Sequence, residues 1–275
     1  MGIISICQPD TEKSCGACCG LYNWEDYSRE TVSEILHSRT DLFQHYFSRR
    51  EVDKLALYQT EVKNRPHPPK MYDDIFNCEF LGFVDQNRRR VGCLLHPMVN
   101  DGYDYRDYAF YGKELCFGHE CPSNTYLNTE EKFLVTHVLG DWYLYGLVVT
   151  DIDLVKDYYK KIRTHLGGPL KPEILKDPQL TVIARDFFSL KENWKFRKKG
   201  RFGKYAFSYG EYRLAKMDYE GLGTKESKYH NILLSLGSSF ETGGDLLEAE
   251  EILERHIWRF VERYRNIDPL WYRLR

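Results

Sequence analysis

The sequence predicts a mainly α-helical fold with irregular segments and a small β content, in which a loop-rich cysteine domain packs on a helical domain. Two observations favour this fold class. All eight cysteines precede residue 122, and residues 71–122 are rich in Gly, Asp and Tyr but lack sustained apolar periodicity. Beyond Pro122, apolar residues recur at helical spacing. We therefore expect a cysteine-rich metal-binding domain at residues 1–125 and a helical domain at residues 126–275.

The composition is that of a globular protein without a strong charge bias. The 275 residues are 42% hydrophobic, with 39 Lys and Arg against 41 Asp and Glu. This balance gives no whole-chain electrostatic reason to expect a nucleic acid or an anionic membrane as partner. No stretch reaches the roughly 18 consecutive apolar residues of a membrane span. Residues 1–6 lack the features of a secretory signal, so we expect a cytoplasmic protein without membrane association.

The amino-terminal half predicts one amphipathic helix followed by irregular structure. Residues 41–63 place apolar side chains at imperfect helical spacing among many charges, which indicates a helix packed along one side. Pro66, Pro68 and Pro69 end it. From residue 71 to residue 122 we expect short strands, turns and loops, as in many segments that supply ligands.

The carboxyl-terminal half predicts several helices. Asn128 and Glu131 have the spacing of a capping pair, which opens a long apolar stretch over residues 133–149. Thr150 and Asp153 have the spacing to begin the next helix.

Two further helices are expected beyond the Gly-Gly-Pro run at residues 167–169, which ends the preceding one. The first covers about residues 180–194. The second is the clearest in the chain, with Asp245 as N-cap and Glu248 completing the capping box.

Residues 195–205 interleave basic and aromatic side chains. The basic members are Lys195, Arg197, Lys198, Lys199, Arg201 and Lys204. Such a pattern can hold a phosphate backbone and stack bases. In a chain of balanced charge we instead favour a solvated turn between two packed elements, so we expect no nucleic-acid partner. The patch would still suit an acidic surface on a protein partner.

The candidate metal ligands are the cysteines Cys7, Cys15, Cys18, Cys19, Cys78, Cys93, Cys116 and Cys121. In a reducing compartment, clustered cysteines indicate metal ligands or redox groups before disulfides. The two-residue separation of Cys15 and Cys18 lets both sulfurs face one zinc ion or iron–sulfur cluster. Cys19 directs its side chain elsewhere: to a second ion, to the other side of a cluster, or into the core. By number alone, eight thiols make two sets of four.

The downstream cysteines come with other donors. His96 follows Cys93, and His119 and Glu120 lie between Cys116 and Cys121. Imidazole nitrogen is an acceptable ligand for zinc or iron. Two alternatives stay open: a single buried cysteine acts as a small apolar side chain, and His96, before a proline, can orient a turn by hydrogen bonding.

Three runs resemble a known family: Cys15–Gly20 (CGACCG), Cys78–Phe83 (CEFLGF) and Val91–Pro97 (VGCLLHP). Together they resemble the bacterial YkgJ-type cysteine-cluster proteins, described as zinc- or iron-chelating, over about residues 7–122. The resemblance implies that five cysteines are metal ligands: Cys15, Cys18, Cys19, Cys78 and Cys93. Cys7, Cys116 and Cys121 are added from residue type and position. The doublet directly follows the pair spacing, whereas family members usually interpose residues.

Three functions follow from these residues. The favoured one is metal binding, with thiolates of the amino-terminal half holding an iron–sulfur cluster or zinc. The second is an iron–sulfur enzyme acting on protein side chains, because the flagellin lysine N-methylases have a similar cysteine pattern; Glu120 would then transfer protons. The third is a thiol-switch interaction protein. We find no nucleotide-binding, nucleophile-elbow, zinc-protease or kinase motif.

Overall fold

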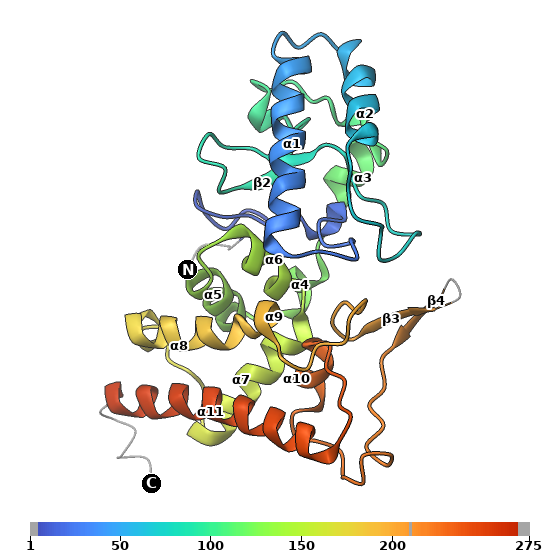
Figure 1. Ribbon diagram of the computed structural model, residues 1–275. Coiled ribbons are helices and arrows are strands. Elements are labelled where there is room, and N and C mark those ends of the chain that lie inside the picture. Colours follow the sequence, from blue (N-terminus) through green and yellow to red (C-terminus); the bar gives the residue numbers. More distant parts are fainter. Residues whose placement is uncertain (1–4, 209–210, 269–275) are drawn as a thin grey trace. The chain divides into compact units, whose positions relative to one another are not determined.

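The computed structural model describes residues 5–208 and 211–268, with the backbone alone for 205–208 and 211–213. Within these ranges the chain divides into two compact units. We call residues 5–124 and 141–146 the cysteine unit, and residues 125–140 and 147–268 the helical unit (Figure 1). The described elements are mainly helices, with two small two-stranded sheets, which confirms the predicted fold class. Segment 141–146 was not expected on the cysteine side.

The cysteine unit combines two helices with a hairpin and short turns. Its elements are α1 (Arg29–Phe47), α2 (Lys54–Asn64), β1 (Leu81–Phe83), β2 (Val91–Cys93), α3 (Gly112–Gly118) and the start of α4 (Pro122–Tyr126). The expectation of one helix over 41–63 was wrong. The chain leaves α1 after Phe47 and restarts at Lys54, with Arg50 between them in the left-handed region at φ 56°. The Arg50 amide donates to the Phe47 carbonyl at 2.9 Å, so the chain turns here after the end of α1.

The hairpin packs against α1. β1 and β2 pair antiparallel with Leu81 opposite Cys93. The Phe83 amide donates to Thr40 Oγ1 on α1 at 2.8 Å. A Cβ on Gly82 would approach that same oxygen to 2.8 Å, so a side chain at Gly82 would push the hairpin away from the helix.

The helical unit contains the remaining elements. They are α5 (Thr129–Val138), α6 (Trp142–Val149, of which the end from Leu147 belongs here), α7 (Ile152–Leu166), α8 (Pro178–Phe188), α9 (Leu190–Asn193), β3 (Tyr205–Ser208), β4 (Glu211–Leu214), α10 (His230–Ser235) and α11 (Gly243–Ile267). The Asn128–Glu131 capping box is confirmed, with Glu131 N donating to Asn128 Oδ1 at 2.9 Å. None of the described helices is long and apolar enough to cross a membrane.

Two helix starts lie beside the predicted residues. Asp151, not Thr150, caps α7 by accepting from the Leu154 amide. Thr242 caps α11, and Asp245 closes the box as its third residue. In both cases neighbouring residues offer a capping oxygen at workable spacing, and the backbone entry angle selects between them.

The core of the helical unit is aromatic. Tyr158 of α7 stacks on Phe187 of α8 with ring centroids 4.0 Å apart. Phe260 of α11 packs edge-on against the Tyr158 ring, with a centroid distance of 6.0 Å. All three side chains are fully buried. Each contributes about 1.5–3 kcal/mol through burial, so the three helices are held by one shared cluster.

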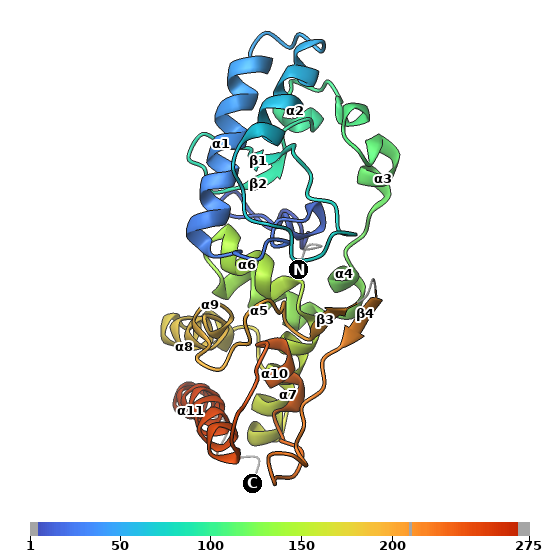
Figure 2. The same cartoon turned by 45° about the vertical axis from the view of Figure 1, so that its right-hand side comes forward.

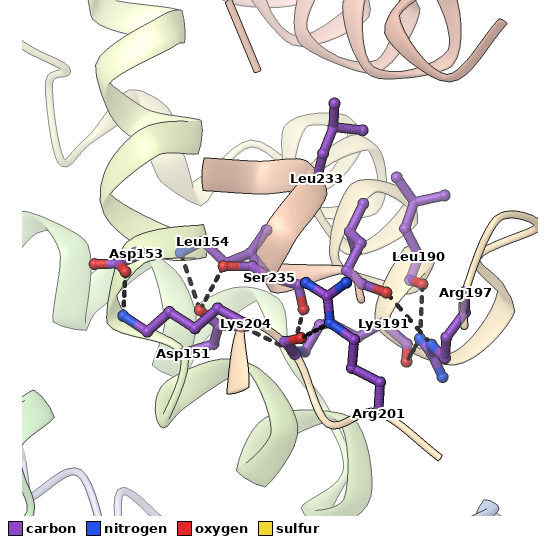
Figure 3. Close-up of polar contacts among 12 residues, drawn as sticks. Asp151, Asp153, Leu154, Leu190, Lys191, Arg197, Arg201, Lys204, Leu233 and Ser235 are labelled. Carbon is purple, nitrogen blue, oxygen red and sulfur yellow. Dashed lines mark hydrogen bonds and ion pairs between the residues drawn. The ribbon is translucent and has the colours of Figure 1, made fainter. Parts of the chain in front are cut away.

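Several cations of the basic stretch bind groups of their own unit, and Figure 3 shows Arg197, Arg201 and Lys204 among them. Arg197 donates to the Leu190 and Lys191 carbonyls, and Arg201 to those of Gly203 and Ser238. Lys195 pairs with Glu248 and Lys204 with Asp153. These four cations therefore stabilise turns and helix ends of the helical unit.

A buried polar cluster joins α7, α9 and α10 (Figure 3). Lys191 Nζ donates to Asp151 Oδ2 at 2.7 Å and to the Ser235 carbonyl at 3.0 Å. Ser235 Oγ donates to the other Asp151 oxygen at 2.9 Å. The Lys191 side chain is 6% exposed and that of Asp151 12%. Removing one partner would leave the other charge buried without compensation.

Lys191→Met should therefore destabilise the protein by about 3 kcal/mol, because it strands the Asp151 carboxylate. Lys195→Met is the matched control: its ion pair with Glu248 is exposed on both sides, and its loss should change the free energy of unfolding by about 0.5 kcal/mol or less. Denaturant unfolding measures both. Equal effects of the two substitutions would contradict the structural role given to Lys191.

Asp177 links the start of α8 to α11. Its carboxylate accepts from Arg263 Nε at 3.0 Å and Nη2 at 2.6 Å, and from the Leu180 amide at 2.9 Å. These hydrogen bonds, that of Arg263 foremost, hold the pKa of Asp177 below its ordinary value of 3.8. A lowered pKa in the folded state stabilises the protein above pH 3.8, and this stabilisation is lost as the pH falls through the folded-state pKa.

Asp177→Asn should cost about 1 kcal/mol at pH 7, since asparagine keeps the cap but loses the ionic bond to Arg263. The cost should shrink as the pH falls below 4. Asp186→Asn, on the same helix with an exposed Arg259 partner, is the control and should have little effect at either pH. Thermal unfolding between pH 3 and pH 7 tests this; a cost independent of pH would refute the assignment.

Candidate metal centre

Cys7 and Cys15 lie side by side at the two ends of a tight loop. The Cys15 amide donates to the Cys7 carbonyl at 2.9 Å. Between them the Asp10 carboxylate accepts from the Glu12 and Lys13 amides, an Asx turn that reverses the chain. The loop thus brings Cys7 and Cys15, eight residues apart in the sequence, within one backbone hydrogen bond of each other.

The run 15–20 forms the compact turn expected for a ligand pair. Ala17–Cys19 is one 3₁₀ turn, and Gly20 ends it in the left-handed region at φ 77°. A Cβ on Gly20 would sit 2.3 Å from the Phe76 carbonyl oxygen. Only glycine meets both requirements, so the turn lies directly against the segment that leads to Cys78.

Two asparagines fasten this turn to the Cys78 segment. The Cys78 amide donates to the Cys19 carbonyl at 2.9 Å. Asn77 Nδ2 donates to the Gly20 carbonyl at 3.0 Å, and Asn23 Nδ2 donates to Asn77 Oδ1 at 2.8 Å. Both side chains are buried. Since buried amides left unsatisfied are costly, this pair fixes the relative position of Cys19 and Cys78.

Cys93 joins the same group through the hairpin. The Leu81 amide donates to the Cys78 carbonyl, and Leu81 pairs with Cys93 across the two strands. Cys78 belongs to the apolar core of the unit, and Cys19 and Cys93 pack against that core. Arg39, buried on α1, donates from Nη1 to the Cys78 carbonyl at 2.9 Å. Three thiols from three segments therefore share one neighbourhood.

Cys116 and Cys121 lie on a segment at the margin of the unit (Figure 2). Residues 113–120 are all exposed, and helix α3 has no buried residue. Even Leu115 and Phe117 are 65% and 80% exposed. We call residues 112–121 the cysteine arm. It is anchored before α3 by the stacking of Phe110 on Phe76 at 4.4 Å between ring centroids.

Burial is the main cause of the raised pKa values of several of these thiols. Burial raises the pKa of Cys7 to about 11, with further increases from the charges of Cys18 and Cys121. Burial also raises the pKa of Cys15, and Cys18, Cys7 and Cys121 add to this. Negative charge on neighbouring thiols thus adds to the effect of burial at both Cys7 and Cys15.

Burial acts in the same way on two further cysteines. It raises the pKa of Cys78 to about 12 and that of Cys93 to about 11; the charge of Cys93 adds to the first shift and that of Cys116 to the second. A hydrogen bond between the Cys18 and Cys19 thiols raises the pKa of Cys19 and lowers that of Cys18, and the charges of Cys78 and Cys93 raise the pKa of Cys19 further.

The two candidate histidines differ. His96 Nδ1 accepts from the Met98 amide at 3.1 Å and so caps the following turn, the alternative considered for it above. Burial lowers its pKa. His119 is exposed on the cysteine arm and lies near Cys18, whose pKa its positive charge lowers. Of these two histidines, His119 is the one with an electrostatic interaction with a cysteine thiol.

The donor set suits zinc or an iron–sulfur cluster, since all eight cysteines are free thiols within one unit. The side chains of these cysteines lie in one unit but do not converge on a single metal position. Among the described residues, no three His, Cys, Asp or Glu side chains are already placed to hold one metal ion. The residue types fit a metal, and the convergence of the sulfur atoms would have to accompany its binding.

Some positioning residues carry no local sequence signal. Tyr145 OH donates to the Ile6 carbonyl at 2.8 Å and Tyr22 OH to that of Tyr143 at 2.8 Å. Gly146 permits this contact, because a Cβ there would lie 2.1 Å from Tyr22 OH. Segment 141–146 thus anchors the backbone beside Cys7. Only a Gly in an apolar helical run hinted at a close approach.

No protein-family model, curated protein or solved structure matches the chain.

Gly20→Ala should disrupt the cysteine unit, at a cost of about 3 kcal/mol or more, because it combines backbone strain with a collision at Phe76. Gly102→Ala is the matched control: its φ is 91°, but nothing lies within 4 Å of the added Cβ, so only about 1–2 kcal/mol of strain is expected. Alkylation of buried Cys78 reports the loss of packing. Equal alkylation rates in the two variants would contradict the packing of this turn.

Proposed function

We propose that the cysteine unit is a metal-binding module of the cysteine-cluster type, in which thiolates hold zinc or an iron–sulfur cluster. One observation carries the proposal. Cys7, Cys15, Cys18, Cys19, Cys78 and Cys93 come from four segments of chain, and backbone hydrogen bonds and strand pairing gather them in one compact unit. The resemblance to YkgJ-type proteins points to the same function.

The alternative, that each cysteine is only a small apolar side chain, does not account for their gathering in one unit. A cysteine that only fills space is as compatible with a distant position as with a neighbouring thiol. Here burial and the charges of neighbouring thiols together raise the pKa values of Cys7, Cys15 and Cys93. A bound cation would favour the thiolate forms instead.

Zinc and an iron–sulfur cluster make different demands on the unit. A structural zinc takes four ligands in a tetrahedron, whereas a cluster also needs inorganic sulfide. Thiolates satisfy both, so the metal has to be identified by analysis of the anaerobically purified protein for zinc, iron and sulfide.

A thiol switch is the second candidate, and the adjacency of the free thiols Cys18 and Cys19 on one turn favours it. Intact mass distinguishes the two functions. Each disulfide lowers the mass by two hydrogens. A thiol switch treated with oxidised glutathione, which accepts the two electrons, should show this decrease and lose it again on reduction, whereas zinc-bound thiolates should keep the mass of the reduced chain.

Zinc added to the reduced, metal-free full-length protein should bind with release of protons, because burial keeps these thiols protonated. The apparent affinity should therefore rise with pH, by about tenfold or more per pH unit between pH 6 and pH 8. Calorimetry in buffers of different ionisation enthalpy measures the proton release.

The same protein alkylated under denaturing conditions and refolded is not a fair control, since its packing changes. Magnesium is the appropriate one: an oxygen-seeking ion should neither bind nor release protons. Full reactivity of all eight thiols towards alkylation in the presence of zinc would refute the proposed function.

A further inference from the structure

We propose that the helical unit contains a binding pocket for a small phosphate ester with free hydroxyl groups, a sugar phosphate being the simplest case. The pocket has a volume of about 330 Å³ and is lined by residues from segments 198–201, 216–222 and 238–241. All three segments belong to the helical unit, so this site is independent of the metal binding proposed for the cysteine unit. Its volume falls in the range of small-molecule sites.

The cations of the pocket come from the basic stretch and from the segment beside it. Lys198 and Arg201 line it from the first, and Lys216 from the second. The Ala215 amide donates to the Lys204 carbonyl at 2.8 Å, which brings Lys216 alongside the stretch. Clefts lined by like charge concentrate the field and attract ions of opposite sign. The pocket therefore favours an anion.

Two of these cations are available to a ligand. Lys195 and Lys204 pair with carboxylates, whereas within the described residues Lys198 and Lys216 take part in no ion pair. The side chains of Lys198 and Lys216 are both exposed. A phosphate bound between them gains charge-assisted hydrogen bonds without breaking an existing ion pair.

Arg201 forms the buried side of the pocket. Its side chain is 7% exposed. Nε donates to the Gly203 carbonyl at 2.9 Å and Nη1 to the Ser238 carbonyl at 3.0 Å. These two bonds go to neutral carbonyl groups, so they fix the guanidinium without cancelling its charge. A bound anion then interacts with a cation that is already ordered.

The wall that carries Lys198 is fixed by backbone pairing. The Lys198 amide donates to the Gly237 carbonyl at 2.9 Å, and the Ser239 amide donates to the Phe196 carbonyl at 2.9 Å. This pairing places the hydroxyl-bearing Ser239 on the same wall as Lys198. The hydroxyl group can donate a hydrogen bond to a phosphate oxygen.

The other wall is a turn over residues 218–222. Asp218 Oδ1 accepts from the Gly221 amide at 2.8 Å, and the Leu222 amide donates to the Asp218 carbonyl at 3.2 Å. The turn packs closely on the start of α11, since a Cβ on Gly243 would lie 3.0 Å from the Leu222 carbonyl oxygen. Both walls are thus formed before any ligand binds, which lowers the ordering cost of binding.

The remaining lining residues indicate the kind of phosphate. Asp218 and Glu241 line the pocket, and their carboxylates would repel a ligand that is anionic throughout but accept hydrogen bonds from hydroxyl groups. Phe240 adds an apolar face and packs against Phe196 with ring centroids 5.3 Å apart. These groups together suit a phosphate joined to a hydroxylated carbon skeleton. A polynucleotide would instead need a continuous track of available cations.

Calorimetry of the full-length protein with inorganic phosphate and with ribose 5-phosphate tests the site at low ionic strength. Both should bind, the ester more tightly. Lys198→Met and Lys216→Met should each weaken binding about tenfold, because each removes one charge-assisted hydrogen bond. Lys199→Met is the matched control: Lys199 is exposed and lies outside the described lining of the pocket, so the affinity should change less than about twofold.

Glu241→Ala separates the two parts of the ligand. It should leave the affinity for inorganic phosphate unchanged or raise it, because a like charge is removed. It should also reduce the advantage of ribose 5-phosphate over inorganic phosphate, because a hydroxyl acceptor is lost. Equal weakening of both ligands would contradict the ligand class.

Three results would overturn the pocket assignment. One is the absence of binding of either ligand at millimolar concentration. Another is an equal loss in Lys199→Met and Lys198→Met, which would show screening by surface charge alone. The third is a single-stranded oligonucleotide that binds more tightly than ribose 5-phosphate and depends equally on Lys198 and Lys199. None of these results bears on metal binding by the cysteine unit.

Discussion

The buried Asn23–Asn77 pair is the constraint on which the cysteine unit depends. It joins the turn that carries Cys18 and Cys19 to the segment that carries Cys78, and the Cys78–Cys19 backbone hydrogen bond lies between them. Without this clamp, two loops separated by more than fifty residues would pay the full entropy of being held together. Thiols that repel one another's charge can be kept adjacent only by such neutral, satisfied contacts.

The two units stabilise themselves by different means. The helical unit has an aromatic core around Tyr158 and a buried ionic cluster around Lys191. The cysteine unit also has a core, around Phe80, but it leaves eight free thiols and an exposed arm. A metal would supply to this unit what the aromatic cluster supplies to the other, since structural zinc contributes folding free energy directly.

Sequence patterns were sufficient for the fold class, the Asn128 capping box and the compact turn at Cys15–Gly20, because each depends on residues close together in the chain. The positions of the cysteines relative to one another could not be predicted. They depend on the register of Leu81 with Cys93 and on the Asx turn at Asp10, which bring distant residues together. The break between α1 and α2 was missed, since Arg50 in a left-handed conformation has no sequence signal comparable to glycine.

The most direct measurement of the central claim is X-ray absorption at the metal edge of the protein purified from cells without added metal. The account predicts bound zinc or iron with a first coordination shell of sulfur alone, at about 2.3 Å for zinc. A shell dominated by nitrogen or oxygen at about 2.0–2.1 Å would contradict it, as would a preparation with all eight thiols reduced and no metal.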